Sequence, residues 1–181
     1  MKMAITAGKV ITVCAALAAT VSLSGCGLTQ KVSEGTKAVT TSIFYKQVRT
    51  LHLDIRARAA LNVNDDGIPL PTMIRIYQLK DRKAFDGADY KALSTGDGLV
   101  IKADLLAEKD IRLKPGEAVA VDMPVEEATQ YVAIAALFLS PDQTRNSWRV
   151  VIPRQELDPD KARRIEASDN RLTLLPLKEK K

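Results

Sequence analysis

The sequence predicts an all-β protein, an antiparallel β-sandwich with one small helical insertion. Three observations favour this fold class. About seven short segments have the alternating or β-branched pattern of strands, turn residues separate them at short intervals, and a single segment has a helical pattern. The first 48 residues lack this pattern, so the sandwich is expected to be one domain at residues 49–181.

The first strand is expected at residues 51–61, where apolar and polar residues alternate over about a dozen positions. The positions on the buried side of this alternation are Leu51, Leu53, Ile55, Ala57, Ala59 and Leu61. His52, the only histidine, falls on the polar side beside Asp54. This placement favours a solvent-facing strand residue over a catalytic histidine.

A prominent loop is expected at residues 62–71, because asparagine, aspartate, glycine and proline favour turns. The second strand follows at 72–79, and the prolines leave open whether the loop closes a hairpin or is a crossover. Residues 62–67 resemble a calcium loop superficially, but position 72 is threonine where that pattern requires glutamate. An ordinary turn is therefore favoured over a calcium site.

The remaining elements follow from shorter patterns. Residues 81–93 have helical spacing that Gly87 weakens, and residues 99–107 are ambiguous between helix and strand. Pro115 and Gly116 indicate a type II turn between two strands. The apolar run 131–139 predicts a central strand buried on both faces. Further strands are expected at 148–152 and at either side of a turn at 168–170.

Composition and motifs argue against several functional classes. The net charge is +5 and basic residues are scattered, which makes nucleic acid an improbable partner. No Gly-x-Ser-x-Gly or phosphate-binding glycine motif is present, and the acidic pairs lie in turns or extended segments, where neighbouring side chains point apart. The sequence has one histidine and two cysteines, and neither cysteine is expected to be a free thiol in the mature domain. These residues cannot build a zinc or copper site. We therefore expect no enzyme activity, metal or cofactor.

The chain begins with the features of a bacterial lipoprotein signal. Lys2 and Lys9 provide a basic start, an uncharged apolar run covers residues 10–21, and Leu-Ser-Gly-Cys follows at 23–26. This box resembles the lipoprotein signal-peptidase site, where the cysteine becomes the lipid-bearing N-terminus. We expect a signal peptide at 1–25, then acylated Cys26 and a flexible tether at 26–48. An ordinary secretory signal with a chance cysteine is the alternative.

The lipid attachment has two consequences. Three acyl chains, at about 0.8 kcal/mol per buried CH₂, bind a membrane far more strongly than one myristoyl chain, so the anchor should be permanent. Cys14 leaves with the signal peptide and Cys26 is acylated, so the mature domain has no thiol or disulfide. Gly27 follows the cysteine, whereas aspartate there resembles the inner-membrane retention signal of enterobacterial lipoproteins. The outer membrane is therefore the expected location.

Several segments together resemble the outer-membrane lipoprotein of the type VI secretion system, the SciN or TssJ family. They are the signal box, the strand 51–61, residues 75–79, Phe85, residues 88–90, 103–107 and 113–117, the strand 131–138, and Trp148 with Arg149. They occur in the family's order over nearly the whole mature domain. The most specific are 75–79 and the Leu-Lys-Pro-Gly-Glu sequence at 113–117.

The resemblance implies a transthyretin-like β-sandwich that binds the periplasmic C-terminal domain of a large inner-membrane protein of the TssM/IcmF family. It also implies that the loop after the first strand contacts this partner, which here means Asn64, Asp65, Asp66, Gly67 and Ile68. The alternative for each loop residue is that it only connects strands. A lipid-anchored carrier of a small apolar ligand remains the rival function, and would need a pocket of about 300 Å³ or more between the sheets.

Overall fold

The computed structural model describes residues 47–95 and 98–177, which belong to one compact unit. The expected signal peptide, Cys26 and residues 26–46 of the expected tether lie outside the described residues. Val48, the last residue of that tether, is 8% exposed and packs with the core. None of the helices in the described ranges is long and apolar enough to cross a membrane.

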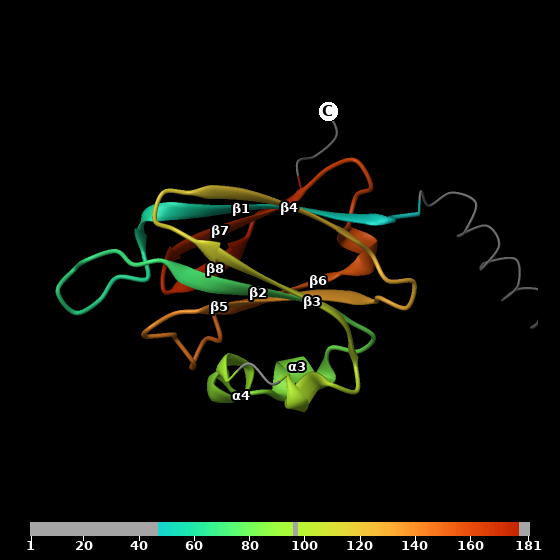
Figure 1. Cartoon of the computed structure of the whole chain (residues 1–181), viewed down its shortest axis with the longest axis horizontal. Coiled ribbons are helices and arrows are strands. Elements are labelled where there is room, and N and C mark those ends of the chain that lie inside the picture. Colours follow the sequence, from blue (N-terminus) through green and yellow to red (C-terminus); the bar gives the residue numbers. More distant parts are fainter. Residues whose placement is uncertain (1–46, 96–97, 178–181) are drawn as a thin grey trace, which may run out of the picture. The chain divides into compact units, whose positions relative to one another are not determined.

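Eight strands in this part of the chain form two four-stranded sheets packed face to face (Figure 1). The first sheet, in spatial order, contains β4 (Ala118–Pro124), β1 (Thr50–Leu61), β7 (Arg163–Asp169) and β8 (Arg171–Leu174). The second contains β3 (Leu105–Leu113), β2 (Thr72–Leu79), β5 (Tyr131–Leu137) and β6 (Arg149–Pro153). The expected all-β sandwich is confirmed.

Among the described strands, four connections, β1–β2, β3–β4, β4–β5 and β6–β7, cross from one sheet to the other, and one strand pair is parallel. Strands β1 and β2 lie in different sheets, so loop 62–71 is the crossover that the sequence left open, not a hairpin. Strand β7 pairs with β1 in parallel, although every other strand pair is antiparallel. The parallel pair was not predicted, because alternation along one strand carries no information about the direction of its neighbour.

The alternation predicted for β1 holds over most of its length. Leu51, Leu53 and Ile55 are at most 1% exposed and point toward the second sheet, while His52, Asp54 and Arg56 lie on the opposite, outer face. The prediction is wrong at Ala59, which is exposed. A register shift between Ala57 and Leu61 in the pairing with β7 inserts extra residues there, and such a bulge interrupts the period of two.

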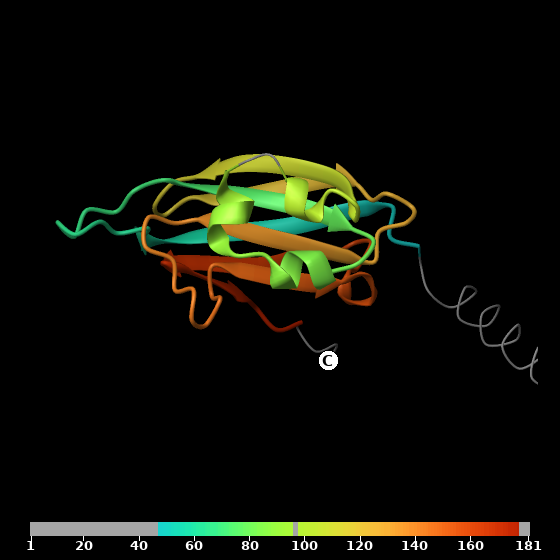
Figure 2. The same ribbon diagram turned by 90° about the horizontal axis from the view of Figure 1, so that it is seen from below.

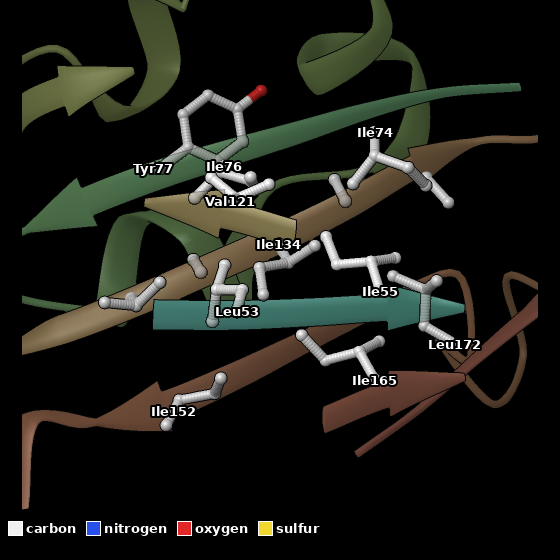
Figure 3. Close-up of a cluster of buried hydrophobic side chains, with 14 of the residues drawn as sticks. Leu53, Ile55, Ile74, Ile76, Tyr77, Val121, Ile134, Ile152, Ile165 and Leu172 are labelled. Carbon is white, nitrogen blue, oxygen red and sulfur yellow. The ribbon is translucent and has the colours of Figure 1, made fainter. Parts of the chain in front are cut away.

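Branched aliphatic side chains from both sheets fill the core (Figure 3). Leu53 and Ile55 of β1 meet Ile76 of β2 and Ile134 of β5, and each is at most 1% exposed. Burial of a side chain of this size contributes roughly 1.5–3 kcal/mol. Side chains therefore fill the interior between the sheets. This is the space that the apolar ligand of the rival carrier hypothesis would occupy.

A helical insertion covers the outer face of the second sheet (Figures 1 and 2). It consists of α3 (Lys83–Gly87), α4 (Tyr90–Ser94) and the 3₁₀ turn η1 (Leu99–Ile101). The single helix expected at 81–93 is thus two short helices, and the break follows Gly87. Its buried apolar residues are Phe85, Ala88, Leu93 and Ile101. Their cover explains why β5 is buried on both faces, as expected from its sequence.

Two arginines of the second sheet hold this insertion. The Arg149 guanidinium in β6 donates to the carbonyl oxygens of Phe85, Asp86 and Ala88 at 2.6–2.9 Å. It also lies over the rings of Phe85 and Trp148, with its central carbon 5.5 and 4.9 Å from the ring centres. Arg75 in β2 donates to the carbonyl of Leu93 at 2.8 Å. The insertion is therefore fastened by charge-assisted bonds as well as apolar contact.

The loops divide between the two ends of the sandwich (Figure 1). Strand β1 starts at the end where residue 47 enters, which we call the tether end. Loop 62–71 lies at the opposite end, the loop end, together with turn 114–117 and loop 138–148. Gly116 has a φ of +74°, as the expected type II turn requires. The tether end carries loop 125–130 and the 3₁₀ turn η2 (Arg154–Glu156).

Candidate functional site

Loop 62–71 extends beyond the strands at the loop end (Figures 1 and 2). Its base is fixed by Asn62, which is 3% exposed and has a left-handed φ of +48°. The Asn62 side chain donates to the carbonyl of Pro71 at 3.1 Å and accepts from the backbone N–H of Leu139 at 2.8 Å. Its own N–H donates to the carbonyl of Asp169 at 2.6 Å. One buried asparagine therefore connects three loop-end segments, two through its side chain and one through its backbone.

The tip of the loop is organised by Asn64. Its Oδ1 accepts from the backbone N–H groups of Asp66 at 3.1 Å and Ile68 at 2.8 Å. Its backbone N–H donates to Ile68, and its carbonyl accepts from Gly67, at 3.1 and 3.0 Å. Gly67 has a φ of +75°, which suits glycine. These four bonds close residues 64–68 into a compact turn.

The side chains that the turn leaves available are those of Asp65, Asp66 and Ile68. All three are exposed, and Ile68 is 54% exposed although it is a large apolar residue. Within the described ranges, neither carboxylate forms an ion pair. The tip thus presents two unpaired negative charges and one apolar side chain on a backbone that is already ordered.

The five residues expected to bind a partner therefore fall into two groups. Asn64 and Gly67 shape the backbone, whereas Asp65, Asp66 and Ile68 face solvent. A partner would meet the second group directly and depend on the first only for its geometry.

Sequence reasoning missed Leu139 as a surface residue. The apolar run 131–139 was expected to be one buried strand, but β5 ends at Leu137 and Leu139 is 60% exposed at the loop end. The following Ser140 and Pro141 were the available signal, because both residues favour turns and proline has no N–H to donate to a strand ladder.

The described residues offer little for other chemistry. They contain no group of three or more His, Cys, Asp and Glu side chains placed to hold a metal ion. His52 lies on the outer face of the first sheet, with its Nδ1 2.5 Å from a carboxylate oxygen of Asp122. A hollow of about 390 Å³ lies beside β7, and its lining includes Asp158, Lys161 and Arg164. The rest of its lining is Ala162, Arg163, Pro176 and Leu177. None of these seven residues belongs to the apolar core between the sheets, where the rival hypothesis would place its ligand.

Residues 49–172 match the model of the type VI secretion lipoprotein family, which includes VasD, EvfM and TssJ. The chain belongs to this family. No curated protein sequence matches this lipoprotein.

Solved structures agree with the family. A chain in a structure titled "T6SS protein TssM C-terminal domain (869-1107) from EAEC" is 55% identical, with a TM-score of 0.67 over 72% of this lipoprotein and 100% of that chain. A chain in "Type VI membrane complex" is 57% identical, with a TM-score of 0.69 and the same coverages. TssJ1 from Pseudomonas aeruginosa, at 24% identity, TM-score 0.60 and coverages of 72% and 99%, shares the fold. The fold is transthyretin-like.

Proposed function

We propose that this lipoprotein binds the periplasmic C-terminal domain of the TssM/IcmF-type inner-membrane component of a type VI secretion system. Loop 62–71 makes the contact, and the lipid anchor then attaches the envelope-spanning complex to the outer membrane. A chain that is 55% identical to this one, over 72% of this one and 100% of that chain, occurs in a structure whose title names the TssM C-terminal domain. A second, 57% identical, occurs in one whose title names the type VI membrane complex.

The observation that carries this proposal is the ordered, unpaired tip of loop 62–71. Four hydrogen bonds within residues 64–68 order the backbone before any partner arrives, so little conformational entropy remains to be lost on binding. Asp65 and Asp66 can pair with basic groups of a partner, and Ile68 can add apolar contact area. Loop 62–71 lies at the opposite end of the sandwich from residue 47, where the described part of the chain begins.

The anchor is part of the same proposal. Cys26 carries the lipid after removal of residues 1–25, residues 26–48 form the tether, and residues 49–181 form the binding domain. Gly27 after the cysteine supports delivery to the outer membrane, with the domain facing the periplasm. The function is structural and not enzymatic, which the lack of a nucleophile or nucleotide motif in the sequence supports.

The binding test is calorimetry with residues 27–181 and the periplasmic C-terminal domain of the TssM-type protein from the same secretion system. We expect one binding event with a Kd in the micromolar range or tighter. A well-folded lipoprotein domain that releases or absorbs no heat beyond dilution, over a range of temperatures, would rule the proposal out.

The anchor makes a separate prediction at Cys26. In a bacterium with lipoprotein processing, the full chain should lose residues 1–25, gain the mass of three acyl chains at Cys26, and sediment with outer membranes. The Cys26→Ser variant should keep its signal peptide uncleaved or appear without acyl mass. Mass spectrometry of the purified N-terminal peptide decides this, and an unmodified Cys26 in the membrane-bound protein would contradict the anchor.

A further inference from the structure

Leu139 combines an exposed apolar side chain with a tightly held backbone. Its side chain is on the surface, yet the backbone of three consecutive residues is bound by side chains from three other segments. The Thr72 hydroxyl donates to the carbonyl of Leu137 at 2.7 Å, the Tyr90 hydroxyl to that of Phe138 at 2.5 Å, and the Leu139 N–H to the Asn62 side chain at 2.8 Å. The position of this leucine is thus determined by β2, α4 and the base of loop 62–71.

Outside loop 62–71, three other exposed apolar residues of the described chain, Leu99, Val100 and Leu177, have no such side-chain bonds to their backbone. Leu99 and Val100, at 65% and 43%, lie in the short η1 turn, and Leu177 lies at the last described position. Met73, at 37%, pairs in register with Leu137, two residues before Leu139.

We infer that Leu139 is a second anchor residue for the partner domain that contacts loop 62–71. The inference rests on the proposed function. A single buried amide, Asn62, is bonded both to the end of loop 62–71 and to Leu139, so the two contact regions keep one spacing. The complementary surface on the partner is an apolar side chain or pocket for Leu139, flanked by basic groups that meet Asp65 and Asp66.

Two features make Leu139 a better anchor than its exposure alone implies. An exposed leucine on an already ordered backbone gains contact area on binding without the cost of ordering that backbone. Its neighbour Phe138 is 2% exposed and part of the core, so the segment cannot retract or rotate without disturbing packing. Energetically dominant interface residues are typically of this kind, large side chains on rigid supports surrounded by weaker polar contacts.

The test compares Leu139→Gln with Leu99→Gln, which makes the same change at a similarly exposed leucine on the helical insertion. Calorimetry against the TssM-type domain should show at least a tenfold weaker Kd for Leu139→Gln and less than a twofold change for Leu99→Gln. Both variants should keep the wild-type unfolding temperature within about 1 °C. An unchanged Kd for Leu139→Gln would overturn the inference, because loss of the leucine side chain would then leave the binding affinity unaffected.

A labelling measurement gives an independent readout. Residues 27–181 contain no cysteine, so Leu139→Cys and Leu99→Cys would each carry the only thiol. At a partner concentration that saturates both variants by calorimetry, the partner domain should slow maleimide labelling at position 139 and leave labelling at position 99 unchanged. One outcome would refute the second anchor but keep the proposed function. In it, Leu139→Cys is labelled equally with and without partner, whereas the wild type binds and Asp65→Lys with Asp66→Lys weakens binding. No binding by the wild type would refute both.

Discussion

The asparagine and aspartate side chains of loop 62–71 have different roles. Asn62 is buried, and its side-chain amide binds two backbone groups, the carbonyl of Pro71 and the N–H of Leu139. The side-chain oxygen of Asn64 accepts from two backbone N–H groups. Asp65 and Asp66 are exposed, and their carboxylates have no ion pair among the described residues. The amides therefore determine the shape of the loop, and the acids determine its charge.

This division leads to a prediction about charge. Asp65→Lys combined with Asp66→Lys should weaken binding of the TssM-type domain by tenfold or more, because two attractive pairs become repulsive. The free energy of unfolding should change by less than about 0.5 kcal/mol, as for other exposed positions. Calorimetry and urea denaturation at matched salt measure the two effects.

The matched control changes the same charges at the tether end. Glu126 and Glu127 are also adjacent, acidic and exposed, so Glu126→Lys with Glu127→Lys alters the net charge equally. If the control weakened binding as much as the loop variant, the effect would be one of overall charge, and the loop would lose its special role.

At the scale of elements, the helical insertion depends on the sheet that it covers. Helices α3 and α4 have five residues each, too few to be stable alone in water. Arg149 supplies donors to three carbonyl oxygens around the end of α3, and its guanidinium stacks on two aromatic rings. Burial lowers the pKa of Arg149, whereas Asp86 raises it. The ordinary arginine pKa is so high that the group stays charged near neutral pH.

Replacement of Arg149 should therefore loosen the insertion. We expect Arg149→Met to lower the free energy of unfolding by about 2–3 kcal/mol, because carbonyls lose charged donors. Arg149→Lys should lose nearly as much, since an ammonium group cannot reproduce the planar fork. Urea denaturation measures the loss, and amide hydrogen exchange should quicken first at 85–94. The loss should be equal at pH 6 and pH 8. If Arg149→Lys were as stable as the wild type, a positive charge alone would be enough to hold the insertion on the sheet.

At the scale of the whole molecule, two buried amides hold opposite ends of the sandwich. Asn62 binds the loop end, and Gln78, which is fully buried, binds the tether end. The Gln78 side chain donates to the carbonyl of Pro124 at 2.7 Å and accepts from Glu126 and Thr129 at 2.8 Å each. Gln78 belongs to β2 and Pro124 to β4, so this group links one sheet to the other.

The two ends should respond differently to equivalent changes. Asn62→Ala and Gln78→Ala should each lower the free energy of unfolding by about 1–3 kcal/mol, because buried backbone groups lose their partners. Only Asn62→Ala should also weaken binding of the TssM-type domain, because the substitution releases loop 62–71 and Leu139. Asn62→Gly tolerates the left-handed φ and so separates backbone strain from lost hydrogen bonds. Equal loss of affinity in both alanine variants would contradict a binding site confined to the loop end.

Local sequence patterns predicted most strands of this molecule but not how the strands pair in the two sheets. The alternation of Leu51, Leu53 and Ile55 is a property of one segment, so β1 was visible in the sequence. The parallel partner of β1, the bulge at Ala59 and the exposure of Leu139 all depend on segments far away in the chain. The loop residues were found through family resemblance, whereas their separation into shaping and exposed side chains required the hydrogen bonds.

The course of β1 has a mechanical consequence. This 12-residue strand runs from the tether end to loop 62–71, so a pull between a lipid anchor and a loop-bound partner would act along its axis. Strand β1 is flanked by β4 and β7, and ladder hydrogen bonds lie across the strand direction. A force along β1 therefore loads many bonds on both sides in shear at once, instead of peeling them one by one. The same strand that positions the loop is thus placed to withstand tension between residue 47 and a partner bound at the loop end.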